Sequence, residues 1–342
     1  MFILFVVYVL VVLWGVKFSV KDKEYFGDYI SKDKSTSIKG IFILLVFFSH
    51  FNKYATYTGL MDAVYFKIVG VVGQIMVVPF LFYSGYGVME SIKRKGKEYV
   101  ATIPKNRILK VFLQYAIAMS VVLIIRFAMG EKILFFDVLL TFVCWKRDWF
   151  ILAIIFLYLF TYLSFKIIKT EKYFINVLLV FTLTVFYIVI LCNLKSSYWY
   201  DTVLAYPVGM LYSLYREKIE KLTTYRLYKW IFSLLIIGIF AAGLKVFGTE
   251  NLITVLLGFI LTGIFIVIFT TRVSLHNKVL NWVGVHLFEI YLLHQVPIMV
   301  LNKIGFIQIS PPVSFIIAVT ITMMLSFWFA KGYKKLWKLI ER

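Results

Sequence analysis

Long apolar blocks constrain this chain more than any other feature of its sequence. Eleven blocks follow one another, each close to the roughly 20 residues that a helix needs to cross a hydrocarbon core. They fall at about 2–19, 38–57, 68–91, 108–128, 149–168, 174–193, 200–215, 229–247, 251–271, 282–302 and 313–330. Because a helix satisfies its own backbone hydrogen bonds inside lipid, the sequence predicts an all-α, polytopic transmembrane helical bundle. We expect about ten core helices plus one extra N-terminal helix.

Composition supports a membrane protein and argues against a soluble one. Hydrophobic residues make up 62% of the chain and charged residues 16%, against roughly 45–50% and 25% in soluble domains. The 37 Lys and Arg residues outnumber the 17 Asp and Glu residues, which gives a net charge of +20. In a soluble protein this excess would indicate nucleic-acid binding, but cytoplasmic loops of membrane proteins collect Lys and Arg. We therefore expect contact with membrane lipid and no nucleic-acid partner.

The basic residues alternate with loops that are poor in charge, and this alternation predicts a topology. The clusters lie at about 21–34, 93–107, 166–172, 216–229, 272–278 and 331–338. The positive-inside rule places all six in the cytoplasm, provided that the block at 132–144, which is too short to span, stays outside. The N-terminus is then outside and the C-terminus is cytoplasmic. We expect residues 1–34 to form the extra helix and a cytoplasmic linker, and 35–342 to form the main domain.

Two polar residues in the second block mark a candidate site. An ionisable group inside lipid is costly unless it is paired or faces a cavity. Lys39 and His50 are eleven residues apart, so at about 100° and ~1.5 Å per residue they share one helix face and lie ~16 Å apart. A snorkelling lysine and an interhelical hydrogen bond from the histidine are the competing structural interpretations.

The tenth block carries a second deep histidine. His294 follows Tyr291 by three residues, so both lie on one helix face, and Gln295 adds a polar group beside them. Counted from the cytoplasmic end, His294 lies ~20 Å into the block, at a depth similar to that of His50. A polar packing contact between helices is the alternative interpretation.

The third block combines small residues with polar ones at Ser84 and Tyr86. Small residues allow another backbone to approach closely, so helix packing is the favoured interpretation of this segment.

Cys144 and Cys192 have no CxxC spacing, and the chain has no H-E-x-x-H sequence, so we predict no metal site.

Six short elements occur in an order typical of one family. They are Lys39 with His50 as [R/K]-x10-H, Phe82 to Tyr86 as F-x-x-SGY, a basic segment from Lys93 to Arg107, Trp149-Phe-Ile-Leu, Pro207-Val-Gly-Met and Tyr291-Leu-Leu-His-Gln. Over about 35–330 the chain resembles the acyltransferase-3 family of bacterial integral membrane acyltransferases. The family often has Asp three residues before the basic position, where this chain has Thr36.

The resemblance implies O-acetyltransferase chemistry. It implies transfer of an acyl group, by default acetyl, from cytosolic acyl-CoA to a hydroxyl of a cell-surface or exported polysaccharide. A hydroxyl needs a base, and His50 is the expected catalytic base, with Lys39 as the other catalytic residue. Lys93, Arg94 and Arg107 are the expected contacts for the phosphates of acyl-CoA.

Supporting roles are expected for Ser84, Tyr86, Tyr291, His294 and Gln295. His294 and Gln295 would orient His50, hold the acyl oxygen or bind the sugar, and the sequence does not rank these roles. We expect no permanently bound cofactor, since acyl-CoA is a donor substrate, and a bacterial plasma-membrane location. The chain ends without the extra extracytoplasmic domain that many members carry, so the acceptor would be modified directly or through a partner protein of the same glycan pathway.

Two other functions fit part of the pattern. An exporter or flippase of a lipid-linked sugar would use a similar polar cavity, but such proteins commonly show internal repeats or broken helix pairs, and neither is seen in the sequence. A membrane-bound O-acyltransferase of the other major type would pair its histidine with an intramembrane Asn, and Asn176 and Asn193 are not placed beside one.

Overall fold

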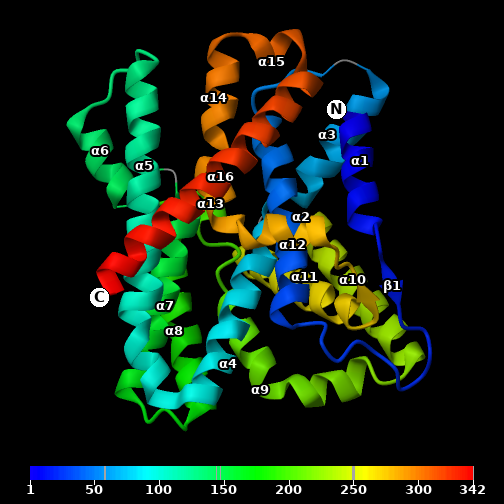
Figure 1. Cartoon of the computed structure of the whole chain (residues 1–342). Helices are drawn as coiled ribbons and strands as arrows, with labels where there is room; N and C mark the ends of the chain where they lie inside the picture. The colour runs from blue at the N-terminus through cyan, green and yellow to red at the C-terminus, as the bar shows by residue number, and fades with distance from the viewer. Residues whose placement is uncertain (58, 144, 147, 249–250, 342) are drawn as a thin grey trace.

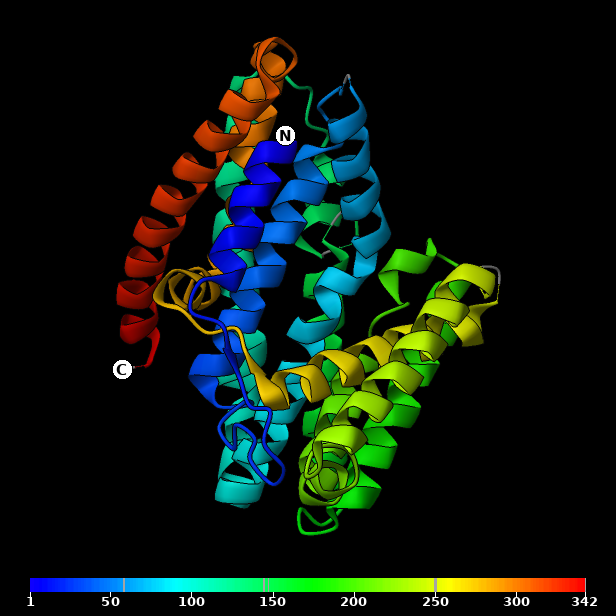
Figure 2. The same ribbon diagram turned by 90° about the vertical axis from the view of Figure 1, so that its right-hand side faces the viewer.

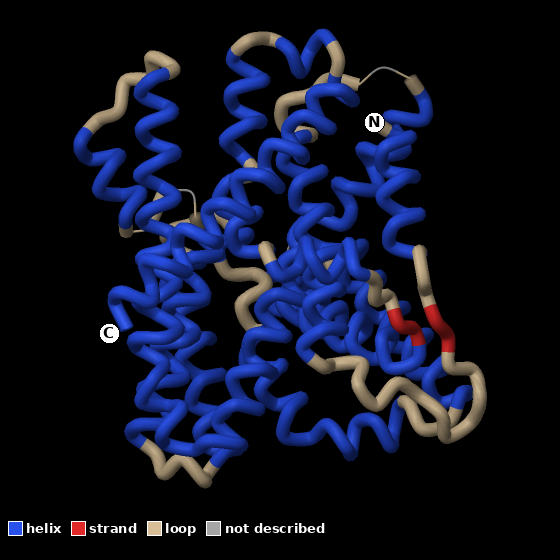
Figure 3. Tube along the Cα trace, viewed as in Figure 1, coloured by secondary structure: helices blue, strands red, loops and turns tan. Residues whose placement is uncertain are grey.

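The computed structural model describes residues 1–57, 59–143, 145–146, 148–248 and 251–341, so Cys144 lies outside the described residues. The chain is 81% helical, which confirms the all-α fold class (Figure 3). The helices are α1 Phe2–Leu13, α2 Lys32–Phe51, α3 Leu60–Val72, η1 Gly73–Val77, α4 Val78–Ile103, η2 Pro104–Leu109, α5 Lys110–Ala128, α6 Phe135–Phe142, α7 Trp149–Ile167, α8 Tyr173–Cys192, η3 Ser197–Trp199, α9 Ala205–Thr223, α10 Leu227–Phe247, α11 Leu252–Arg272, α12 Lys278–Val285, α13 Leu287–Leu293, α14 Gln295–Lys303, α15 Phe306–Ile309 and α16 Pro311–Glu341 (Figure 1).

Apolar helices of spanning length confirm the expected polytopic bundle. Among the described residues, seven helices are long and apolar enough to cross a membrane, or up to eight if the bent pair 278–285 and 287–303 forms one span. Blocks 68–91 and 108–128 fall in one uninterrupted helical run, Leu60–Ala128, which counts once in this total. The run is 69 residues long and kinks at Gly96, whose φ is +56°, so the two blocks remain separate segments.

Three other blocks depart from single straight spans for local reasons. Helix α1 has 12 residues, about 18 Å at ~1.5 Å per residue, which is shorter than a hydrocarbon core of about 30 Å. Helix α9 begins at Ala205 and continues through a charged second half to Thr223, so it does not have the composition of a span. The block 282–302 is bent by 63° between α12 and α13.

Helix α2 lies in the interior of the bundle. In the apolar stretch of α2, 67% of the residues are buried, whereas in that of α10 the share is 0%. In Figure 2, α16 runs along one side of the molecule and the α10–α11 hairpin lies on the opposite side. The least apolar of the spanning helices is thus the most enclosed, as expected for a helix whose polar residues face protein rather than lipid.

Glycines bring α4 and α9 into close contact. A Cβ at Gly85 would overlap the backbone of Tyr206, and a Cβ at Gly209 would overlap the backbone of Phe82. The small residues of the third block therefore do serve helix packing, and their partner is the Pro207-Val-Gly-Met element.

The linker that follows α1 is fixed to the segment that follows α11. Strand β1 (Lys17–Phe18) pairs antiparallel with β2 (Val273–Ser274). Arg272, 1% exposed, donates hydrogen bonds to the carbonyl oxygens of Ser19, Lys21 and Thr224 at 2.9–3.1 Å. These contacts fix the linker that leads to Ile30 and to Lys32 at the start of α2, and both residues line the cation-rich cavity described below.

Candidate active site

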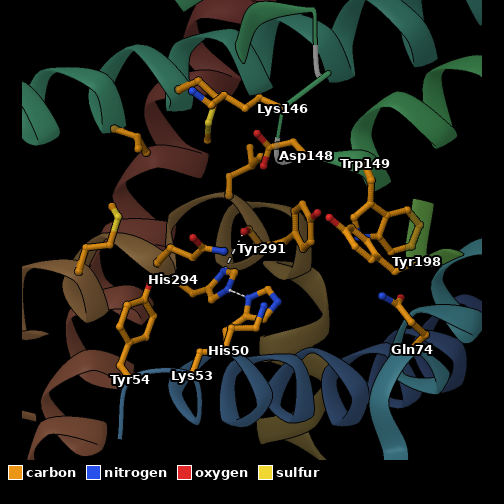
Figure 4. A pocket seen from close by; sticks show the side chains of 15 residues that line it. His50, Lys53, Tyr54, Gln74, Lys146, Asp148, Trp149, Tyr198, Tyr291 and His294 are labelled. Atoms are coloured by element: carbon orange, nitrogen blue, oxygen red, sulfur yellow. Dashed lines mark hydrogen bonds between the residues drawn. The ribbon is translucent and has the colours of Figure 1, made fainter. Parts of the chain in front are cut away.

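A cavity of about 480 Å³, here called the histidine cavity, lies between α2, α7 and α13–α14 (Figure 4). Its polar and aromatic lining residues are His50, Lys53, Tyr54, Gln74, Lys146, Asp148, Trp149, Tyr198, Tyr291, His294 and Gln295. The three predicted residues of the tenth block thus lie in the same cavity as His50. They lie where α13 meets α14 at His294, whose φ of −61° and ψ of −28° remain helical.

His50 and His294 contact each other directly. Nδ1 of His50 is 2.5 Å from Nε2 of His294, and the two rings are nearly parallel, with centroids 4.8 Å apart (Figure 4). His294 is 2% exposed, and its Nδ1 faces the carbonyl oxygens of Tyr291 at 2.8 Å and Ile290 at 3.1 Å. Among the described residues, Nε2 of His50 has no hydrogen-bond partner, and it is not one of the fully buried polar atoms, so this nitrogen reaches the cavity.

A second cavity of about 560 Å³, here called the basic cavity, is lined by four cations and, among the described residues, by no carboxylate. The cations are Lys32, Lys39, Arg94 and Arg107. In the described part of the chain, none of them forms an ion pair. The cavity therefore carries an uncompensated positive charge, which favours an anionic ligand.

Arg107 is held in place by tyrosines rather than by an acid. Its Nε donates to the hydroxyl of Tyr99 at 3.0 Å, and its guanidinium lies 5.8 Å from the ring centre of Tyr158. Ser84 exchanges a hydrogen bond of 2.9 Å with the hydroxyl of Tyr158. Because these partners are neutral, Arg107 keeps its full charge available to a ligand.

One aromatic layer separates the two cavities. On α7, Trp149 lines the histidine cavity and Phe150 lines the basic cavity. On α13, Tyr291 lines the histidine cavity and Phe288 lines the basic cavity. The rings of Phe150 and Tyr291 lie 5.3 Å apart. The cavities are thus neighbours along α2, α7 and α13.

The predicted site residues divide between three places. His50, Tyr291, His294 and Gln295 line the histidine cavity, while Lys39, Ser84, Tyr86, Arg94 and Arg107 line the basic cavity. Lys93 lies in neither: it pairs with Glu90 at 2.7 Å, donates to the carbonyl oxygen of Ser213 and lines a separate surface pocket.

Sequence reasoning missed most of the wall opposite His50. Gln74, Asp148 and Tyr198 carried no recognisable signal, and Asp148 is the N-cap residue of α7, where an acidic side chain is ordinary. Trp149 stood in one of the short elements but was not assigned to the site.

Apolar spans around a buried histidine pair, with a cation-lined cavity beside it, define a multi-pass helical protein with an enclosed polar site. Residues 35–331 match the model of the acyltransferase-3 family, which is described as an acyltransferase domain. The chain belongs to this family and is a membrane acyltransferase. No curated protein and no solved structure matches the chain.

Proposed function

We propose that this acyltransferase moves an acyl group, acetyl by default, from acyl-CoA in the basic cavity to a hydroxyl of a glycan in the histidine cavity. The observation that carries the proposal is that α2 alone presents Lys39 to a cation-lined cavity and His50 to a neighbouring cavity of different character. Such an arrangement suits a reaction between a highly anionic donor and a neutral polar acceptor.

The charge of the basic cavity supports acyl-CoA as the donor. The phosphates of CoA are strong hydrogen-bond acceptors, and Arg and Lys bind phosphate through charge-assisted hydrogen bonds. Lys39, Arg94 and Arg107 are the proposed contacts, and Lys32 joins them from the first turn of α2. Lys93, paired with Glu90, is not proposed as a donor contact.

His50 supports the chemical step. A hydroxyl is a weak nucleophile at neutral pH, and a base within hydrogen-bond reach removes its proton as it attacks. In the proposed step, the thioester end of the donor passes the layer of Phe150 and Tyr291 to reach the histidine cavity. The acceptor oxygen then bonds to the thioester carbonyl carbon and its proton passes to His50. The carbon–sulfur bond then breaks, and the CoA thiolate takes that proton, so that an ester and free CoA are the products.

The far wall of the histidine cavity supports a sugar acceptor. Trp149, Tyr198 and Tyr54 offer apolar ring faces, while Asp148, Gln74 and Gln295 offer hydrogen-bonding groups (Figure 4). A sugar has both an apolar face and several hydroxyls, and small-molecule sites typically combine aromatic walls with a few polar groups. The acceptor is proposed to be a surface or exported polysaccharide.

Orientation follows from the positive-inside rule. We place the basic cavity toward the cytoplasm of a bacterial plasma membrane, because Lys32, Arg94 and Lys105 belong to the basic clusters. The N-terminus is then outside and the C-terminus inside, and the acceptor reaches the histidine cavity directly or with a partner protein.

The test is acyl transfer by the purified chain in liposomes, with labelled acetyl-CoA and an isolated surface glycan. Wild type is expected to esterify the glycan, and His50→Ala to lose about 10²–10⁴-fold of the rate. His286→Gln is the matched control, because this histidine bonds only to the carbonyl oxygen of Trp282 in the described residues and lines neither cavity. Wild-type activity of His50→Ala would disprove the assigned base, and glycan export without turnover of any acyl-CoA would favour the exporter alternative.

A further inference from the structure

We infer that His294 is a positioning residue that fixes the tautomer of His50, so that Nε2 of His50 is the basic atom of the site. This inference rests on the proposed function, since it concerns the same histidine. Its evidence is a hydrogen-bonded series of four groups: the Tyr291 carbonyl, the two nitrogens of His294 and Nδ1 of His50.

The protonation of His294 follows from its surroundings. Its Nδ1 faces two backbone carbonyl oxygens, Tyr291 at 2.8 Å and Ile290 at 3.1 Å, and a carbonyl oxygen only accepts hydrogen bonds. Nδ1 of His294 therefore carries the hydrogen. His294 is 2% exposed and has no ion-pair partner in the described part of the chain. Because a buried unpaired cation is strongly disfavoured, the ring is neutral and its Nε2 has no hydrogen.

The protonation of His50 follows from that of His294. Nε2 of His294 is an acceptor and lies 2.5 Å from Nδ1 of His50, so a hydrogen must lie between them, and His50 Nδ1 donates it. A neutral His50 then has a bare Nε2. This is the nitrogen that has no partner among the described residues and reaches the histidine cavity.

This series explains what a second buried histidine contributes. When Nε2 of His50 takes the proton of an acceptor hydroxyl, the imidazolium that forms still donates its Nδ1–H to His294. In hydrolases with a Ser-His-Asp triad, a buried carboxylate holds the imidazole in the correct tautomer and stabilises the imidazolium. Here a neutral imidazole, fixed in turn by a backbone carbonyl, occupies that place. The histidine pair therefore places no carboxylate next to His50, and the acidic residue of the cavity, Asp148, lies on the opposite wall.

The first test reads the tautomer directly, without turnover. The chain has four histidines, so ¹⁵N-histidine labelling in liposomes gives few imidazole signals, and His276→Gln and His286→Gln identify two of them. At neutral pH, His50 is expected to carry its hydrogen on Nδ1. In His294→Ala the His50 signal is expected to show a mixture of both tautomers. Protonation of His50 on Nε2 in the wild type would overturn the inference.

The second test compares two substitutions of His294 by rate. His294→Ala is expected to lower kcat by about 10²-fold, within the range that a positioned base contributes, with an unchanged KM for acyl-CoA. His294→Gln retains an acceptor oxygen for His50 Nδ1 and is expected to restore most of the lost rate. Wild-type kcat in His294→Ala, or equal losses in both variants, would contradict the positioning role. If no acyl-CoA is turned over by wild type while the Nδ1 tautomer is seen, the proposed function fails and the tautomer assignment stands.

Discussion

Lys39 and His50 lie on one face of α2 but line different cavities. Lys39 contributes to the basic cavity and His50 to the histidine cavity, and the Phe150–Tyr291 ring pair lies in the layer between these cavities. A single rigid helix therefore fixes the separation of the proposed donor and acceptor positions.

Removal of a cation from the basic cavity should weaken binding of the donor. A hydrogen bond to a charged group contributes about 1.5–3 kcal/mol, so Arg107→Met is expected to raise the KM for acetyl-CoA about tenfold or more. Lys39→Met should behave similarly, and Lys39→Arg should keep most of the affinity. Steady-state kinetics at low and high salt would measure the effect. Lys93→Met is the control, because Lys93 lines a separate pocket, and an equal rise in its KM would contradict the assignment.

Truncation of Phe150 should widen the passage between the two cavities, which the thioester of the donor must use to reach the acceptor. Its ring lies 5.3 Å from that of Tyr291, and its removal opens a path for water toward the donor. We expect Phe150→Ala to hydrolyse acetyl-CoA without acceptor several-fold faster than wild type, measured as free thiol released. Phe156→Ala is a matched change on the same helix, since Phe156 packs against Phe160 and Tyr187 and lines neither cavity. Equal hydrolysis in both variants would show that Phe150 is no barrier.

The aromatic and acidic wall of the histidine cavity should determine acceptor binding. Tyr198→Ala and Asp148→Asn are expected to raise the KM for glycan by about tenfold, since each removes a proposed sugar contact, and to leave the KM for acetyl-CoA unchanged. Asp148 also accepts a hydrogen bond from Tyr115 at 2.8 Å, so folding of this variant should be checked by thermal denaturation. Tyr228→Ala, on the exposed surface of α10, is the control. If the KM for acetyl-CoA changed and the KM for glycan did not, the assignment of donor and acceptor to the two cavities would have to be exchanged.

Close packing of α4 on α9 should not tolerate a methyl group. A Cβ at Gly209 would overlap the backbone of Phe82, so Gly209→Ala is expected to destabilise the fold by about 1–3 kcal/mol, the usual cost of overpacking. Thermal denaturation in detergent would measure it as a lower midpoint. Gly243→Ala on α10 meets nothing within 4 Å and should leave the midpoint unchanged or slightly higher. A normal midpoint for Gly209→Ala would mean that the two helices do not pack as described.

Much of the site was visible in the sequence because its signals are local. The eleven-residue spacing of Lys39 and His50 fixes their relation within one helix, since the helical period is known without any tertiary contact. Apolar length likewise predicted the helical membrane class. The sequence predicted that both Lys93 and Arg94 contact the donor phosphates, but only Arg94 lines the basic cavity. Adjacent residues point about 100° apart on a helix, and the position of α9 decides that Lys93 is the one that contacts Ser213.

The helical class, the polar stripe of α2 and the short elements typical of the family can all be recognised without the structure. Only the tertiary structure decided that His294 touches His50, that Asp148 and Tyr198 face them, and that one aromatic layer divides the basic and histidine cavities. The physical reason is that helical periodicity depends on neighbours along the chain. The distance between two helices depends instead on how small residues such as Gly85 and Gly209 let distant backbones approach.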